Sequence, residues 1–119
     1  MAAVAAAGYL GLRAWARHQV DLLVEAATRD AREIGNPLIS AIRAYHHDTG
    51  EWPDPYELER DLTPKYISSV DVRFFVVIDN VPELSARYIF FGDDCRLVGR
   101  LDQERWRLGK IELDCPIPP

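Results

Sequence analysis

Hydrophobic residues recur every three or four positions through the first half of the chain. This stripe consists of Leu23, Ala27, Ala31, Ile34, Leu38, Ala41 and Tyr45. Such spacing puts the side chains on one face of an amphipathic helix, which we interpret as a core face. Gly35-Asn36-Pro37 interrupts the stripe without changing its phase. The pattern therefore fits one long helix kinked at Pro37 as well as two successive helices.

The second half of the chain is rich in β-branched and aromatic residues and predicts strands. The candidate strands cover residues 72–78, 86–91, 96–101 and 105–113. We expect the last two to form a hairpin around residues 102–104. The closing residues 116–119 predict a non-regular tail, because their prolines cannot donate hydrogen bonds to a sheet. The sequence thus predicts an α+β fold, with the long N-terminal helix packed on an antiparallel sheet of 3–4 strands.

The segment Leu38 to Ile67, between these halves, predicts a helix end, a turn and a second, short helix. Asp48, Gly50 and the Trp52-Pro53 step end the long helix. The second helix is expected to begin with Asp54 as its N-cap and to end at Thr63-Pro64. Leu58 and Leu62 give this second helix one apolar face, and the aromatic residues that we expect to cover the junction are Tyr45, Trp52, Tyr56 and Tyr66.

Length and charge limit the classes of protein to consider. With 119 residues, the chain is long enough for one modest domain, which we assign to residues 15–119. Fourteen Lys and Arg against nineteen Asp and Glu give a net charge of -5. Residues 48–119 alone carry nine cations and fifteen acids. This acidic part lacks the basic footprint of a nucleic-acid-binding protein, so we expect no nucleic-acid partner.

Residues 1–14 form an apolar segment that suggests part of a membrane anchor. Met1 to Leu12 carries no charge and has no polar face for water. Twelve residues are fewer than the about twenty that span a bilayer, so we expect an anchor that starts upstream of Met1. A soluble, alanine-rich helix start is the alternative. Arg13 and Arg17 follow the segment, and the positive-inside rule would hold that flank in the cytoplasm. Trp15 suits either a membrane interface or a helix contact.

Residues with catalytic or metal-binding chemistry form no recognisable motif. His46 and His47 are adjacent, so on a helix they point about 100° apart and cannot share one metal ion. No serine has the context of a nucleophile elbow, and no phosphate-binding loop, CxxC or HExxH motif is present. Asp93-Asp94 reads as a solvated turn rather than a calcium site. We expect no catalytic residue, no cofactor and no metal site, and hence no enzyme.

The two cysteines, Cys95 and Cys115, leave two interpretations open. They fit either one disulfide that ties the C-terminal strands together or two separate thiols. If the turn at residues 102–104 is tight, Cys95 lies opposite a residue near Ile111 rather than opposite Cys115. A disulfide therefore needs a bulge near Gly109 or a longer reach.

The segment Leu38 to Ile67 resembles the pilin-like proteins, meaning type IV pilins, type II secretion pseudopilins and small bacterial proteins that share their head. The matching residues are Leu38, Ile42, Tyr45, Asp48, Gly50, Trp52, Pro53, Leu58, Leu62, Pro64, Tyr66 and Ile67. The family usually has Tyr-Pro at Trp52-Pro53. The resemblance implies structural roles for these residues, a long N-terminal helix half in the membrane, and a C-terminal disulfide, here Cys95–Cys115. The peptidase site of assembling pilins is not found in this sequence.

These features predict a non-enzymatic protein of the cell envelope, tethered to the membrane by its N-terminal helix and facing the periplasm or the cell surface. Its expected partners are other envelope proteins or further copies of the chain. The helix stripe and the sheet around Trp106 are the expected contact surfaces. The alternative is a small, soluble, cytoplasmic interaction or immunity-type protein, with Met1 as its true start and both thiols free.

Overall fold

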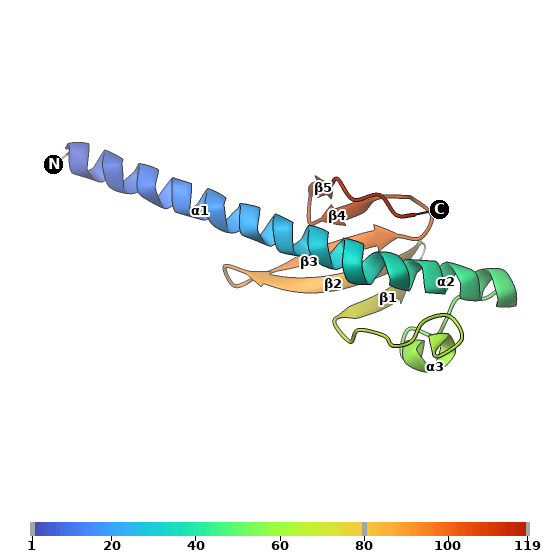
Figure 1. The fold of residues 1–119 in the computed structure, drawn as a ribbon. Helices are drawn as coiled ribbons and strands as arrows, with labels where there is room; N and C mark the ends of the chain where they lie inside the picture. Colours follow the sequence, from blue (N-terminus) through green and yellow to red (C-terminus); the bar gives the residue numbers. More distant parts are fainter. Residues whose placement is uncertain (1, 80, 119) are drawn as a thin grey trace.

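A computed structural model describes residues 2–79 and 81–118, with side chains from Leu12 onward. One continuous helix runs along the molecule and packs its second half on a five-stranded sheet (Figure 1). It comprises α1 (Ala2–Asp30), the π-helical segment η1 (Ala31–Gly35) and α2 (Asn36–Thr49). The N-terminal part of α1 extends beyond the sheet, so the molecule measures 68 × 27 × 24 Å. Within the described residues, no helix is long and hydrophobic enough to cross a bilayer.

The helix passes through Pro37 without ending. The backbone N–H of Asn36 bonds to the carbonyl of Ala31, five residues back, which makes the turn before the proline a π-turn. Asp30 and Asn36 on either side of this turn keep α-helical dihedral angles. Pro37 has no N–H and its ring crowds the preceding turn, and a widened turn accommodates both effects. The helix predicted from the sequence is therefore single, and its irregularity is a π-turn.

The sheet is an antiparallel meander in which each strand pairs with its neighbour in the chain. Its strands are β1 (Phe74–Ile78), β2 (Pro82–Phe90), β3 (Asp93–Arg100), β4 (Trp106–Leu108) and β5 (Ile111–Leu113). This confirms the predicted α+β fold, with more strands than the three or four expected. The extra strand arises because Gly109, at φ 58°, turns the predicted strand 105–113 back on itself.

The core lies between the helix and one face of the sheet. Ala27, Ala31 and Leu38 of the helix stripe are fully or almost fully buried, as predicted. They face a layer of sheet residues that consists of Phe74, Val76, Leu84, Ala86, Leu97, Trp106 and Leu108. The indole of Trp106 is completely buried, and its Nε1 donates a 2.7 Å hydrogen bond to Oδ1 of Asn36. A sheet side chain therefore bonds directly to the helix just after its π-turn.

The C-terminal tail is non-regular, as predicted, but it completes the core. Ile117 is 1% exposed, and its N–H bonds to the carbonyl of Glu104 at 3.2 Å. The guanidinium of Arg43, on α2, donates to the carbonyls of Pro118 and Leu101 at 2.9 and 3.0 Å. The tail is thus held from both the helix and the sheet.

The long helix ends as predicted, whereas the short helix begins later than predicted. Gly50 has φ 75°, and its N–H bonds to the carbonyl of His46, which is a left-handed helix stop. Helix α3 covers only Leu58–Leu62. Asp54 does not cap it, because its carboxylate accepts the N–H of Tyr56 in a separate turn.

Candidate functional site

The residues assigned to the family pattern gather where α2 meets α3. The hydroxyl of Tyr66 donates a 2.9 Å hydrogen bond to Asp48, and its ring packs edge-on against Tyr45. The pKa of Asp48 lies below its usual value, mainly because of this hydrogen bond. A hydrogen bond with His47 and the positive charge of Lys65 lower it further. The junction thus ties the end of the long helix to the segment that follows α3.

The remaining pattern residues line the same junction. Trp52 stacks on His46 with ring centroids 3.8 Å apart, and the residues Pro53, Leu58 and Leu62 are buried. The Thr63–Pro64 peptide bond is cis. The rings of Tyr45, Trp52 and Tyr66 thus make packing contacts between neighbouring segments. Tyr56, which was also expected to cover the junction, is 96% exposed, so that part of the prediction is wrong.

Two surfaces expected to meet partner proteins are used inside the fold. The helix stripe packs on the sheet of the same chain. On the sheet, the indole of Trp106 is fully buried between the helix and the sheet, so it is not itself exposed for contact, whereas the opposite face of the same strands is exposed. The side chains of the helix stripe that face the sheet, and the indole of Trp106, therefore belong to the core of the described structure.

Cys95 and Cys115 are free thiols, and the structure does not contain the disulfide predicted from the sequence. Cys95 lies on the helix side of β3, with its sulfur beside Gly109 in the β4–β5 turn. Cys115 is buried next to Asn36 of the helix. Its position in the tail is six residues beyond the turn that Cys95 faces.

The remaining candidate ligands are scattered. Across residues 12–79 and 81–118, no group of three His, Cys, Asp or Glu side chains is arranged to hold a metal ion. Asp93 and Asp94 begin β3 as exposed residues. His46 is occupied by its stack on Trp52.

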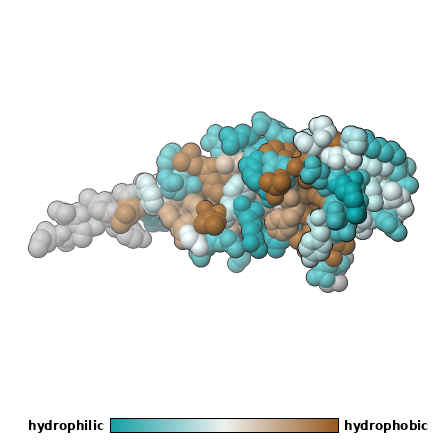
Figure 2. Space-filling model, turned by 90° about the horizontal axis from the view of Figure 1, so that it is seen from below, coloured by the Kyte–Doolittle hydropathy of each residue, from teal (hydrophilic) through white to brown (hydrophobic). Residues whose placement is uncertain are grey.

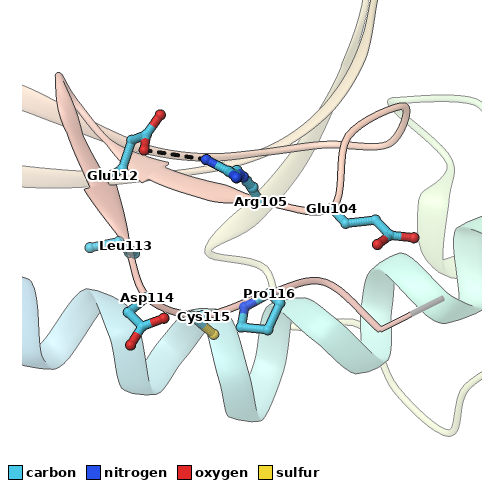
Figure 3. A pocket seen from close by; sticks show the side chains of 7 residues that line it. All are labelled: Glu104, Arg105, Glu112, Leu113, Asp114, Cys115 and Pro116. Atoms are coloured by element: carbon cyan, nitrogen blue, oxygen red, sulfur yellow. Dashed lines mark ion pairs between the residues drawn. The ribbon is translucent and has the colours of Figure 1, made fainter.

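A hollow of about 440 Å³ lies between β5, the tail and the start of β4 (Figure 3). Three carboxylates, from Glu104, Glu112 and Asp114, line it together with Arg105. Arg105 forms a 3.5 Å ion pair with Glu112. The lining is therefore predominantly acidic, and the sulfur of Cys115 lies at its inner side without a neighbouring base (Figure 3).

The outer face of the sheet, turned away from the helix, carries a group of exposed arginines. We call it the arginine face and define it by Phe75, Arg87, Arg96, Val98 and Arg107. The register places Arg87 directly opposite Arg96, and Val98 opposite Arg107. Within the described part of the chain, no carboxylate lies within 4.0 Å of these three guanidinium groups. Like charges directly opposite each other destabilise a sheet. The concentration of positive charge on this face therefore lowers the stability of the folded protein.

Arg96 is held in place by its neighbours. Its Nη2 donates a 3.1 Å hydrogen bond to Oγ of the buried Ser85. Its guanidinium lies 5.6 Å from the ring centre of Phe75. Three acids lie near the arginine face, but none is directly opposite Arg87 or Arg96 in the register. Glu83 lies opposite Arg100, Asp94 opposite Ile89 and Glu112 opposite Arg107. The centre of the arginine face thus presents oriented donors beside an apolar ring.

No protein-family model, curated protein or solved structure matches this chain.

Proposed function

We propose that this chain is a non-enzymatic, membrane-tethered protein of the cell envelope that works by binding another protein. In this proposal the arginine face contacts an acidic segment of the partner, and residues 1–14 contribute to the membrane attachment. The single observation that carries the proposal is the cross-strand pair Arg87–Arg96, within 4.0 Å of which no carboxylate of the described residues lies.

The chemistry of the arginine face favours a protein partner with carboxylates. One carboxylate can accept hydrogen bonds from two guanidinium groups, which would relieve the repulsion between Arg87 and Arg96. Phe75 and Val98 add apolar contact area of the kind found at the centres of interfaces. The net charge of -5 argues against nucleic acid as the polyanion, because the rest of the surface would repel phosphates.

Binding of a synthetic peptide tests the arginine face. The probe is a fluorescein-labelled peptide of alternating Glu and Leu, and its anisotropy is measured at several salt concentrations. We expect Arg87→Gln with Arg96→Gln to weaken binding about tenfold, since two charge-assisted hydrogen bonds are removed. The matched control is Arg17→Gln with Arg32→Gln, which removes the same charge from exposed helix positions. Equal losses in both double variants would show that only net charge matters and would refute the proposed site.

The alternative function is that of a small cytoplasmic interaction or immunity-type protein, which would use the same arginine face. Two observations favour it: both thiols are free, and Arg13 and Arg17 follow the apolar segment.

The mass of the protein isolated from cells without reductant distinguishes the two locations. A deficit of two protons would indicate a Cys95–Cys115 disulfide and an extracytoplasmic location. If both cysteines instead react with an alkylating agent after unfolding, the extracytoplasmic part of the proposal is refuted.

A further inference from the structure

The hairpin that joins β2 and β3 ends in two phenylalanines that meet helix α1. The ring centroids of Phe90 and Phe91 lie 4.3 Å apart, and those of Phe91 and Trp15 lie 5.4 Å apart. Trp15 is nevertheless 53% exposed and Phe91 59% exposed. We call these three residues the aromatic tip. About half of the Trp15 side chain and of the Phe91 side chain remains exposed despite these contacts, so the tip presents a large apolar area to its surroundings.

The backbone of the turn holds Phe91 in an unusual position. Its φ of 52° is in the left-handed region, which bulky residues rarely adopt, and Gly92 follows at 81°. Two successive positive φ values are typical of a tight hairpin turn that favours Asn-Gly or Asp-Gly. A phenylalanine in this place gains no packing in the core, and its ring contacts α1 outside the sheet instead.

Exposed apolar residues and two cations lie on the N-terminal side of the aromatic tip, while Asp93 and Asp94 follow it on the sheet. Leu12 on α1 and Ile89 on β2 are 69% and 77% exposed. The first twenty residues of the chain contain the two cations Arg13 and Arg17, and the first acid is Asp21. Figure 2 shows hydrophobic side chains exposed on the part of the surface toward the N-terminal end of the helix.

We infer that the aromatic tip lies in the headgroup region of an anionic lipid bilayer, with Arg13 and Arg17 bound to lipid phosphates. The inference rests on the membrane attachment proposed above and adds a second contact point to it. Indole and phenyl rings favour the membrane–water interface, and neighbouring cations add electrostatic attraction to anionic lipids. The tip also adjoins an uncharged helical segment, residues 2–12, so both apolar parts lie at the same end of the molecule (Figure 1).

Acidic residues close to the aromatic tip limit how deeply it enters. Asp93 and Asp94 follow the turn directly on β3, and both are exposed. Asp21 is exposed on α1, farther along the helix from the apolar segment. Carboxylates avoid the hydrocarbon core, so the rings reach the headgroup level while the rest of the sheet stays in water.

Vesicle binding by the full chain tests this inference. The vesicles consist of phosphatidylcholine with or without phosphatidylglycerol, and one set carries bromine on the acyl chains to quench tryptophan fluorescence. Trp15 is the reporter, because Trp106 is buried and Trp52 stacks on His46 at the other end of the helix. A Trp15→Phe variant supplies the background signal.

The key variant is Phe91→Asn, because asparagine accepts the left-handed conformation and removes only the ring. Its matched control is Tyr56→Asn, at a residue that is 96% exposed before α3. We expect Phe91→Asn to weaken vesicle binding about fivefold and Tyr56→Asn to change it by less than about twofold. We also expect quenching of Trp15 and tighter binding to vesicles that contain phosphatidylglycerol.

Each result has one meaning. Quenching of Trp15 together with a selective loss in Phe91→Asn supports the aromatic tip as a lipid contact. Vesicle binding without quenching, and with equal affinity of both Asn variants, overturns the inference but leaves the proposed membrane attachment in place. Absence of binding to every vesicle overturns the attachment and the inference together, while the peptide experiment on the arginine face remains unaffected.

Discussion

Gly35 of the helix and Gly99 of β3 lie against the same side chain, the buried indole of Trp106. A Cβ atom added at Gly35 would come within 2.4 Å of this ring, and one added at Gly99 within 2.8 Å. Both distances are far below van der Waals contact. The absence of side chains at these two positions is therefore what allows the helix and the sheet to approach with a tryptophan between them.

This close approach makes the effect of Gly35→Ala opposite to the usual one. In an exposed helix, alanine is more favourable than glycine by about 1 kcal/mol. Here we expect the added methyl group to overpack the core and to lower the free energy of unfolding by about 2 kcal/mol. Urea denaturation measures this change. Ser40→Ala, at an exposed position of α2, is the control and should have almost no effect. Stabilisation by Gly35→Ala would contradict the packing described.

Asp30, a buried acid on the helix, is bonded from the sheet side by Tyr88 and Arg73. The hydroxyl of Tyr88 donates to its carboxylate at 2.5 Å, and Arg73 lies 3.6 Å away. Burial, followed by this hydrogen bond, raises the pKa of Tyr88 well above its usual value of 10. The folded protein therefore holds this proton more tightly than the unfolded chain does.

The raised pKa of Tyr88 predicts a loss of stability at alkaline pH. Its contribution is fully present below pH 10, the usual pKa, and is lost as the pH rises above that value. We expect Tyr88→Phe to lower the free energy of unfolding by about 1–2 kcal/mol at neutral pH, through the lost hydrogen bond. The variant should also show a flatter decline between pH 10 and pH 11.5 in urea denaturation. Tyr56→Phe, at an exposed ring, is the control. Parallel pH curves for wild type and Tyr88→Phe would contradict this prediction.

At the scale of elements, the C-terminal tail is the segment whose importance is least evident from its composition. It has no regular structure, yet Cys115 and Ile117 are buried in the core. We expect Ile117→Ala to lower the free energy of unfolding by about 3 kcal/mol, because it leaves a cavity. Ile111→Ala removes the same atoms from a side chain that is 45% exposed, so its cost should be below about 1 kcal/mol. Equal costs for the two variants would show that the tail is not part of the core.

The elements with strong periodicity were predictable from the sequence, and those set by register were not. The helix stripe and the stop at Gly50 depend on local spacing and backbone preference. The start of β2 at Pro82 was missed because proline is usually read as a strand breaker. The arginine face was missed because the pair Arg87–Arg96 depends on the turn at Phe91-Gly92. The turn takes up Phe91, which the sequence analysis placed in the strand 86–91, and Phe-Gly is not a preferred turn pair.

At the scale of the whole molecule, charge changes along the long axis. The N-terminal end has two cations and no acid within its first twenty residues. The opposite end carries six acids and one cation over residues 48–61 (Figure 1). An anionic bilayer attracts the first end and repels the second. The proposed lipid contact therefore implies an orientation in which α3 points away from the membrane and the arginine face remains open to a partner.

The burial of Ile117 also bears on the order of events during synthesis. The apolar residues 2–12 leave the ribosome about a hundred residues before Ile117, a delay of roughly 5–20 seconds at ordinary rates of translation. The core cannot be completed until that isoleucine is free to pack. If the proposed membrane attachment holds, the N-terminal segment thus has time to reach a lipid surface while the sheet is still unfinished, and the domain folds next to the membrane.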